Sequence, residues 1–369
     1  MPPHSPHKRV VAYNVNPAAA EHEVQTNLAQ ARWLAEILGW PFDGPWQPAA
    51  QGHPGLYFVP SQTLVGPQRE QLAIDGAEDL LGGYVQHGFI ATKAISHPLI
   101  SEGTGVPAGW NPQFAERVRD VVLPGVTVFD LGDARRAATE GLARGVLRVK
   151  LVEACGGEGQ ALLRNDQDLK QWLAGLSPAI CAAGIVLEEN LEQAITHSVG
   201  QTLVDGLLMT YFGEQFQTRN GRGECVYAGS RLTVVRGDYV DLLARDLAAD
   251  VRRAVEYART YDTAAALSFP GFFASRRNYD VVQGIGADGQ QKVGVLEQSW
   301  RVGGATGAEL AALQAFVEQP TRNTVCASTH EVHTEQDAPA QARVLFRGRD
   351  TRGGFLLKYA EVDADDRQQ

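Results

Sequence analysis

The sequence predicts a mixed α/β fold (α+β), and three observations carry this prediction. The chain has 369 residues, which at roughly 150 residues per domain corresponds to two or three domains. Hydrophobic residues make up 44% of the chain and charged residues 21%, as in ordinary soluble globular proteins. Short β-branched runs alternate with segments of helical periodicity, which is typical of strands that pack against helices.

The first part of the chain, residues 1–123, is predicted to be an open α/β domain. Its first strand is Arg9–Tyr13 (RVVAY), and a helix follows over Glu21–Leu38, where apolar residues recur with the helical period. A second strand is expected at Leu56–Pro60 (LYFVP), and a third apolar run spans Tyr84–Lys93.

Residues 124–195 are predicted to form a smaller domain with a tighter alternation of strand and helix. A helix over Asp133–Gly145 has Asp at its start and Gly at its end, which are typical capping residues. The other elements expected here are strands at Val126–Asp130, 146–152, 161–164 and Gly184–Leu187, and a helix at Asp168–Leu176.

The remaining residues, 196–369, are predicted to form a larger domain. Two antiparallel strands are expected on either side of the turn RNGRG, followed by one long helix over Tyr239–Tyr261. Two further strands are joined by a turn at Ala287, Asp288 and Gly289, and another helix begins near Thr306.

Charge and composition exclude several classes of function. The net charge of −10 does not fit a general nucleic-acid binder. No apolar run approaches the ~20 residues that a membrane-spanning helix needs, so we expect a cytoplasmic protein without a membrane partner. Four cysteines without a C-x-x-C pair are interpreted as reduced thiols. The expected partners are small molecules, and the sequence leaves a homodimer open.

A glycine-rich loop is the first candidate for a binding site. Lys150 ends a predicted strand, and Gly156, Gly157, Gly159 and Gln160 follow before the next strand begins. Glycines let backbone N–H groups approach phosphate oxygens closely, and a nearby lysine supplies a positive charge. The segment matches neither a Walker loop nor a G-x-G-x-x-G fingerprint. A simple glycine-rich hairpin turn therefore stands as the alternative.

A second candidate is the strand GIVLEENL, which ends in Glu188 and Glu189. The backbone of such an apolar strand can pair with the edge of an adenine base. A carboxylate at its end would then lie near the ribose or the amine of the base. A solvated strand end is the alternative explanation.

The strongest candidate is a pair of acids on two neighbouring strands. Asp280 and Glu297 flank a short turn, so antiparallel pairing brings the two carboxylates side by side. Magnesium is commonly held by one or two protein carboxylates plus nucleotide phosphates. Arg301, four residues after Glu297, adds a planar group that suits a phosphate or carboxylate. A surface cluster of charges is the alternative.

Two smaller features have open interpretations. Arg276 and Arg277 either reach a substrate or cap a surface strand. The tract STHEVHTE contains His330 and His333 but lacks the i, i+4 histidine pair of a zinc protease, so it is interpreted as a loop.

In this order, the three candidates resemble the ATP-grasp superfamily. Its pattern runs from a lysine and a glycine-rich loop through a hinge strand ending in Glu to an acid on one strand and E-x-N-x-R on the next. The resemblance covers about residues 125–316, with residues 1–123 similar to the domain that precedes the grasp. The strings ATKAISHPL, SRRNYDVVQG and VLEQSWRVGGATGAE also look like an uncharacterised bacterial family placed near ATP-grasp enzymes.

The resemblance implies a role for each matching residue. Lys150 would contact the α- and β-phosphates of ATP, and the loop of Gly156, Gly157, Gly159 and Gln160 would close over the β- and γ-phosphates. The backbone of Glu189 to Leu191 would hold adenine, and Glu188 would accept a hydrogen bond from its amine. Asp280, Glu297 and Ser299 would be the Mg²⁺ ligands, and Arg301 would stabilise the transferred phosphoryl group. Lys93 would be the earlier of the family's two lysines.

This chain departs from the family pattern at Ser299, where the family usually has Asn. Serine is a shorter and weaker ligand, so either water fills the gap or one metal position is lost. The implied activity is an ATP-dependent ligase that joins a carboxylate to an amine or similar nucleophile through an acyl phosphate. The alternatives are a nucleotide-binding protein with reduced or lost catalysis, and an α/β protein that binds another ligand without nucleotide.

Overall fold

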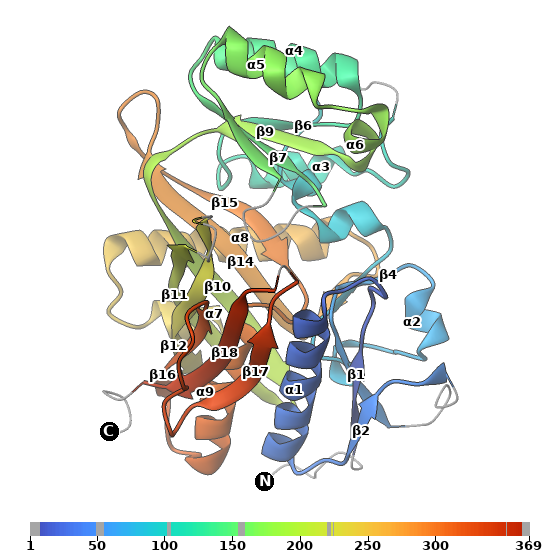
Figure 1. The fold of residues 1–369 in the computed structure, drawn as a ribbon, viewed down its shortest axis with the longest axis vertical. Coiled ribbons are helices and arrows are strands. Elements are labelled where there is room, and N and C mark those ends of the chain that lie inside the picture. Colours follow the sequence, from blue (N-terminus) through green and yellow to red (C-terminus); the bar gives the residue numbers. More distant parts are fainter. Residues whose placement is uncertain are drawn as a thin grey trace.

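The computed structural model describes residues 8–48, 55–101, 105–153, 159–219, 223, 225–351 and 353–363. Four sheets lie in this part of the chain. The largest runs through the centre of the molecule, and a smaller sheet with its helices lies at one end (Figure 1). In the described residues, no helix has the length and apolar character that crossing a membrane requires.

The N-terminal part contains a parallel sheet of three strands in the order β2–β1–β3. These strands are β1 (Arg9–Tyr13), β2 (Phe42–Pro45) and β3 (Leu56–Pro60), and α1 (Glu21–Leu38) connects the first two. The bounds of β1, β3 and α1 match the prediction. Helix α1 ends at Gly39, whose left-handed backbone (φ 66°) is the usual helix stop.

The segment after β3 differs from the prediction. The apolar run over Tyr84–Lys93 is not one strand, because β5 spans Gly83–Val85 and 3-10 turns follow at η3 (Gly88–Ala91) and η4 (Lys93–Ser96). The side-chain amide of Gln298 donates to the carbonyls of Ile90 and Thr92, so a distant side chain satisfies part of this backbone. The neighbouring elements are β4 (Leu64–Val65), α2 (Gln68–Gln71), η2 (Ala77–Asp79) and α3 (Pro112–Val118).

Four antiparallel strands form the smaller sheet at the end of the molecule, in the order β6–β9–β7–β8. The strands are β6 (Gly125–Val128), β7 (Leu147–Leu151), β8 (Gln160–Leu163) and β9 (Ile185–Glu189). Apolar side chains of one face pack on α4 (Leu131–Leu142), α5 (Asp166–Ala174) and α6 (Pro178–Ala183). Because side chains alternate along a strand, Lys150 and Glu188 face the other side, toward the rest of the protein.

The central sheet has eight strands in the order β15–β14–β10–β11–β12–β16–β18–β17. The predicted antiparallel pair around RNGRG corresponds to β11 and β12. The sequence interpretation missed a second hairpin. Asp205 and Gly206, which both have positive φ angles, form the turn that joins β10 to β11. The strands are β10 (Glu192–Val204), β11 (Leu207–Arg219), β12 (Cys225–Arg236), β14 (Arg276–Ile285), β15 (Gln291–Ser299), β16 (Thr324–Val332), β17 (Arg343–Arg349) and β18 (Phe355–Val362).

Two further predictions fail in this part of the chain. The long helix over Tyr239–Tyr261 is instead two helices, α7 (Tyr239–Leu243) and α8 (Ala249–Ser268). The guanidinium of Arg252 on α8 binds the carbonyls of Leu243 and Arg245 between them. His330 lies in strand β16 and not in a loop. No group of three or more potential metal ligands occurs in the described residues.

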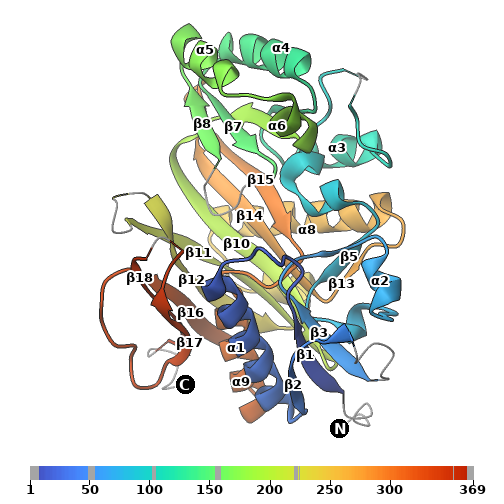
Figure 2. The same cartoon turned by 45° about the vertical axis from the view of Figure 1, so that its right-hand side comes forward.

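Helices cover both faces of the central sheet (Figure 2). Helix α8 packs on one face, and α9 (Thr306–Glu318) packs on the other beside α1. A short strand, β13 (Phe273–Ala274), pairs with β5 and ties the N-terminal part to the central sheet. Tyr279 and Val281 pack with α8, so the alternating residues Arg276, Asn278 and Asp280 of β14 face the same side of the sheet as α9.

Candidate functional site

The two acids of the strongest sequence candidate lie opposite each other. Asp280 on β14 and Glu297 on β15 are direct partners in the antiparallel register, as the short turn between the strands predicts. The turn spans Gly286 to Gln290, where the backbone N–H of Gly286 donates to the carbonyl of Gln290. The sequence prediction of adjacent carboxylates is therefore confirmed in the structure.

Hydrogen bonds fix the position of the Asp280 carboxylate. The side-chain amides of Gln215 on β11 and Asn278 on β14 both donate to Oδ1, at 2.7 and 2.9 Å. Burial and the nearby Glu297 carboxylate raise the pKa of Asp280 to about 6, although the two amides oppose this shift. A bound cation would remove the repulsion between these two neighbouring carboxylates.

A buried cluster of charges lies on the inner face of the small sheet. Lys150 on β7 and Glu188 on β9 form an ion pair with 2.5 Å between Nζ and Oε1, and His97 Nε2 lies 3.2 Å from Glu188 Oε2. All three side chains are almost completely buried. Burial alone would raise the pKa of Glu188, but Lys150 and His97 lower it to about 2. The alternative of a solvated strand end is therefore wrong for Glu188, whose exposed fraction is 1%.

One short segment connects this cluster with the carboxylate pair. Lys93 at the start of η4 places its Nζ 3.1 Å from Glu297 Oε2, and His97 directly after η4 contacts Glu188. The hydroxyl of Thr127 on β6 donates to the carbonyl of Ala94, while Ser96 is hydrogen-bonded to Tyr261 on α8. Residues 92–97 are therefore held by both the small sheet and the central sheet.

Arg276 is buried and does not cap a surface strand, which was one of the two alternatives considered from the sequence. It is 1% exposed, and its Nε and Nη2 bind Glu309 of α9, with 2.6 Å between Nη2 and Oε1. Its Nη1 donates to the carbonyls of Ser299 and Arg301 and lies 3.4 Å from Ser299 Oγ. Arg276 therefore holds the backbone that follows Glu297 and is not a surface cap. Arg277 points to the other face, where it pairs with Asp262 of α8.

The remaining predicted residues lie close to these two clusters. The side chain of Arg301 donates to the Val302 carbonyl, and no carboxylate of the described residues pairs with it. Glu189 pairs with Lys292 and accepts from the N–H of Ala287, so it joins β9 to the turn between β14 and β15. Leu191 is buried against Leu123 and Val282.

The glycine-rich loop is described only at its end. Gly159 has a left-handed backbone (φ 63°), and its carbonyl accepts from the N–H of Leu151. The side chain of Gln160 accepts from Arg148 at 2.9 Å. Gly156 and Gly157 lie outside the described residues, so the prediction of a phosphate loop stays a prediction.

Several residues of the site were not found from the sequence. His97, Gln215, Asn278 and Glu309 contact predicted residues but belong to no recognisable spacing. His97, Asn278 and Glu309 lie within the strings ATKAISHPL, SRRNYDVVQG and VLEQSWRVGGATGAE, which carried the family resemblance. That resemblance was the only sequence signal for them.

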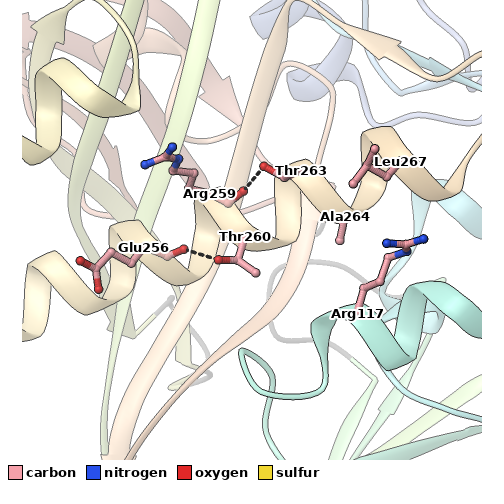
Figure 3. A pocket seen from close by; sticks show the side chains of 7 residues that line it. All are labelled: Arg117, Glu256, Arg259, Thr260, Thr263, Ala264 and Leu267. Carbon is pink, nitrogen blue, oxygen red and sulfur yellow. Dashed lines mark hydrogen bonds between the residues drawn. The ribbon is translucent and has the colours of Figure 1, made fainter.

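A separate surface pocket lies between α8 and α3 (Figure 3). Arg117, Arg259 and Leu267 are among the side chains that line it, and none of the predicted site residues does so. This pocket is on the outer side of α8, away from the face that carries Asp280.

Comparison with protein families matches almost the whole chain. The profile of the family described as "Protein of unknown function (DUF3182)" covers residues 10–360. The chain belongs to this family. No curated protein sequence matches it.

Solved structures show the fold of this DUF3182 protein. D-alanine–D-alanine ligase from Bacillus anthracis is similar with a TM-score of 0.50 and 11% identity, over 85% of this chain and 97% of its own. D-alanyl-alanine synthetase A from Vibrio cholerae O1 biovar eltor gives 0.49 and 11%, over 80% and 88%. D-cycloserine synthetase DcsG gives 0.43 and 13%, over 84% and 99%. The match to the Bacillus anthracis structure shows that the fold is that of ATP-grasp ligases, as the sequence predicts.

Proposed function

We propose that this protein is an ATP-dependent ligase that activates a carboxylate as an acyl phosphate for attack by an amine or similar nucleophile. The observation that carries the proposal is the arrangement around residues 92–97. This segment contacts the Asp280 and Glu297 pair through Lys93, and the Lys150 and Glu188 pair through His97. One short segment therefore connects two lysines with a pair of acids. Lysines to contact the phosphates and carboxylates to hold Mg²⁺ are the groups that would bind one Mg-ATP.

The residues present fit both ATP and Mg²⁺. Asp280 and Glu297 supply the hard oxygen ligands that Mg²⁺ prefers, and the register of β14 and β15 places the two acids opposite each other. Mg²⁺ bound there would neutralise charge on the phosphates during transfer. Lys150 and Lys93 are buried ammonium groups that suit phosphate oxygens.

The adenine would lie against the backbone of Glu189 to Leu191. Glu188 already contacts Lys150 and His97, so its first role is to hold Lys150 in place. A carboxylate oxygen has two acceptor sites, and Glu188 therefore retains capacity for the adenine amine. Gly159 and Gln160, with the rest of their loop, would cover the outer phosphates.

Transfer requires alignment and charge neutralisation more than covalent chemistry from the protein. The substrate carboxylate oxygen attacks the γ-phosphorus, the bond to the β,γ-bridging oxygen breaks, and ADP leaves. Arg301 has no carboxylate partner among the described residues and would stabilise the moving phosphoryl group. The amine then attacks the acyl carbon, and inorganic phosphate leaves.

A second candidate is a nucleotide-binding protein with reduced catalysis. Ser299 favours it, because this side chain replaces the usual Asn and its hydroxyl lies 3.4 Å from Arg276 Nη1. Both candidates predict ATP binding, and they differ in turnover.

The test combines binding with product formation. Mg-ATP at about 100 times its dissociation constant should stabilise the folded protein by roughly 2.7 kcal/mol in thermal unfolding. Release of ADP and phosphate is then measured with a panel of amino and hydroxy acids. Binding and turnover, both reduced in Lys150→Met, support the ligase. Binding without turnover on any substrate favours the second candidate, and the absence of binding rejects both.

A further inference from the structure

The four oxygens of the Asp280 and Glu297 carboxylates are not equally available. Asp280 Oδ1 already accepts from Asn278 at 2.9 Å and from Gln215 at 2.7 Å. Glu297 Oε2 lies 3.1 Å from the Lys93 ammonium. Within the described part of the chain, no side chain donates to Asp280 Oδ2 or to Glu297 Oε1. One oxygen of each acid therefore remains for a cation.

The third expected ligand, Ser299, has a different neighbour. Its Oγ lies 3.4 Å from Nη1 of Arg276, which also binds the Ser299 carbonyl at 3.1 Å. Glu309 is bound by Nε and Nη2, so Nη1 is the part of this buried cation that faces Ser299. A hydroxyl is a weak ligand for Mg²⁺, and a fixed positive charge beside it opposes a second cation there.

A pair of metal ions would need more oxygens than this site leaves. Two ions in such sites are about 3.5–4 Å apart, and a carboxylate that bridges them uses both of its oxygens. Here the Lys93 ammonium already lies at the second oxygen of Glu297, and amide groups saturate one oxygen of Asp280.

We infer that the site binds one divalent cation, through Asp280 Oδ2 and Glu297 Oε1, and that Ser299 is not a ligand. The inference rests on the proposed nucleotide function and specifies its metal site. Asn278 and Gln215 are positioning residues, because they determine which oxygen of Asp280 faces the cation.

Electron paramagnetic resonance of Mn²⁺ tests the number of ions directly. The full-length protein is mixed with a non-hydrolysable ATP analogue and excess Mn²⁺, and unbound ions are removed by rapid gel filtration. The expected result is one Mn²⁺ per chain with the hyperfine pattern of an isolated ion. Two ions per chain, or the spectrum of a spin-coupled pair, overturn the inference while leaving the ligase proposal intact. Retention of no Mn²⁺ contradicts both.

Two variants test the assignment of ligands. Asn278 and Ser299 are partners in the register of β14 and β15, so they form a matched pair. Ser299→Ala should leave the Mn²⁺ dissociation constant within about twofold, whereas Asn278→Leu should weaken binding by roughly 10–100-fold, as is usual for residues that orient a metal ligand. A tenfold loss in Ser299→Ala, or no loss in Asn278→Leu, contradicts the inference. If thermal unfolding shows that Asn278→Leu does not fold, Gln215→Leu removes the other donor to Oδ1 and carries the same expectation.

Discussion

Glu188 and Glu189 are consecutive residues with opposite surroundings. Glu188 is 1% exposed and contacts Lys150 and His97, whereas the Glu189 side chain is 15% exposed and pairs with Lys292, which is 25% exposed. Water screens the second pair and not the first. Two glutamates at adjacent positions of β9 are therefore expected to contribute very differently to the stability of the fold.

Replacing each acid in turn should separate these roles. Glu188→Gln leaves Lys150 buried without its anion, so we expect the free energy of unfolding at pH 7 to fall by about 3–5 kcal/mol. Glu189→Gln should cost about 1 kcal/mol or less. Urea denaturation of both variants measures the difference, and equal losses would contradict the buried ion pair.

The lowered pKa of Glu188 also predicts the pH dependence of stability. The folded protein releases the Glu188 proton at a pKa of about 2, below its ordinary value of 4.5. The stabilisation is therefore fully present above about pH 4.5 and is lost as the pH falls toward 2. The urea midpoint of the wild type should fall more steeply over this range than that of Glu188→Gln. Parallel curves would show that Glu188 does not contribute in this way.

At the scale of elements, α9 is unusual because it is buried almost all round. It packs on the central sheet and beside α1, and it carries Glu309, the partner of Arg276. A Cβ atom at Gly307 would come within 2.7 Å of Thr329 Cγ2 and 3.0 Å of Ala360 Cβ, so the helix approaches β16 and β18 closely there. The position of α9 therefore depends on a glycine that no side chain can replace without a shift.

A larger residue at this position should push the helix away from the sheet. We expect Gly307→Leu to lower the free energy of unfolding by about 1–3 kcal/mol, as overpacking usually does. Gly206→Asn is the control, because nothing lies within 4 Å of its Cβ position and Asn tolerates the left-handed backbone there. Thermal unfolding compares the two, and a Gly307→Leu variant as stable as the control would contradict the close packing.

At the scale of the whole molecule, the last three strands complete the core. Strands β16, β18 and β17 extend the central sheet beyond β12, and they cover α9 with side chains such as Val325, Leu345 and Ala360. Each Å² of apolar surface that these side chains bury stabilises the fold by about 25 cal/mol. The C-terminal strands are therefore part of the fold and not an appendage.

Removal of these strands should prevent normal folding. A chain that ends at Gln319 exposes the apolar side of α9, so we expect lost near-UV circular dichroism, dye binding to exposed apolar surface, and aggregation. Val344→Lys, at a 44% exposed position of β17, should leave all three measurements unchanged. A truncated protein with a native spectrum would show that the core does not need these strands.

The sequence predicted the parts of the fold that local patterns determine. The bounds of β1, β3 and α1 follow from short-range periodicity, and the pairing of Asp280 with Glu297 follows from one short turn. It did not predict η3 and η4, where the carbonyls of Ile90 and Thr92 bind Gln298 about 200 residues away, nor the break between α7 and α8. His97 and Glu309 were missed for the same reason, because their partners are distant in the chain.

Residues 92–97 form a connection between the small sheet and the central sheet. Thr127 binds this segment from the small sheet, while Gln298 and Tyr261 bind it from the side of the central sheet. Any displacement of the small sheet relative to the central sheet would therefore load the hydrogen bonds of this segment from both ends, and Lys93 and His97 would feel it directly.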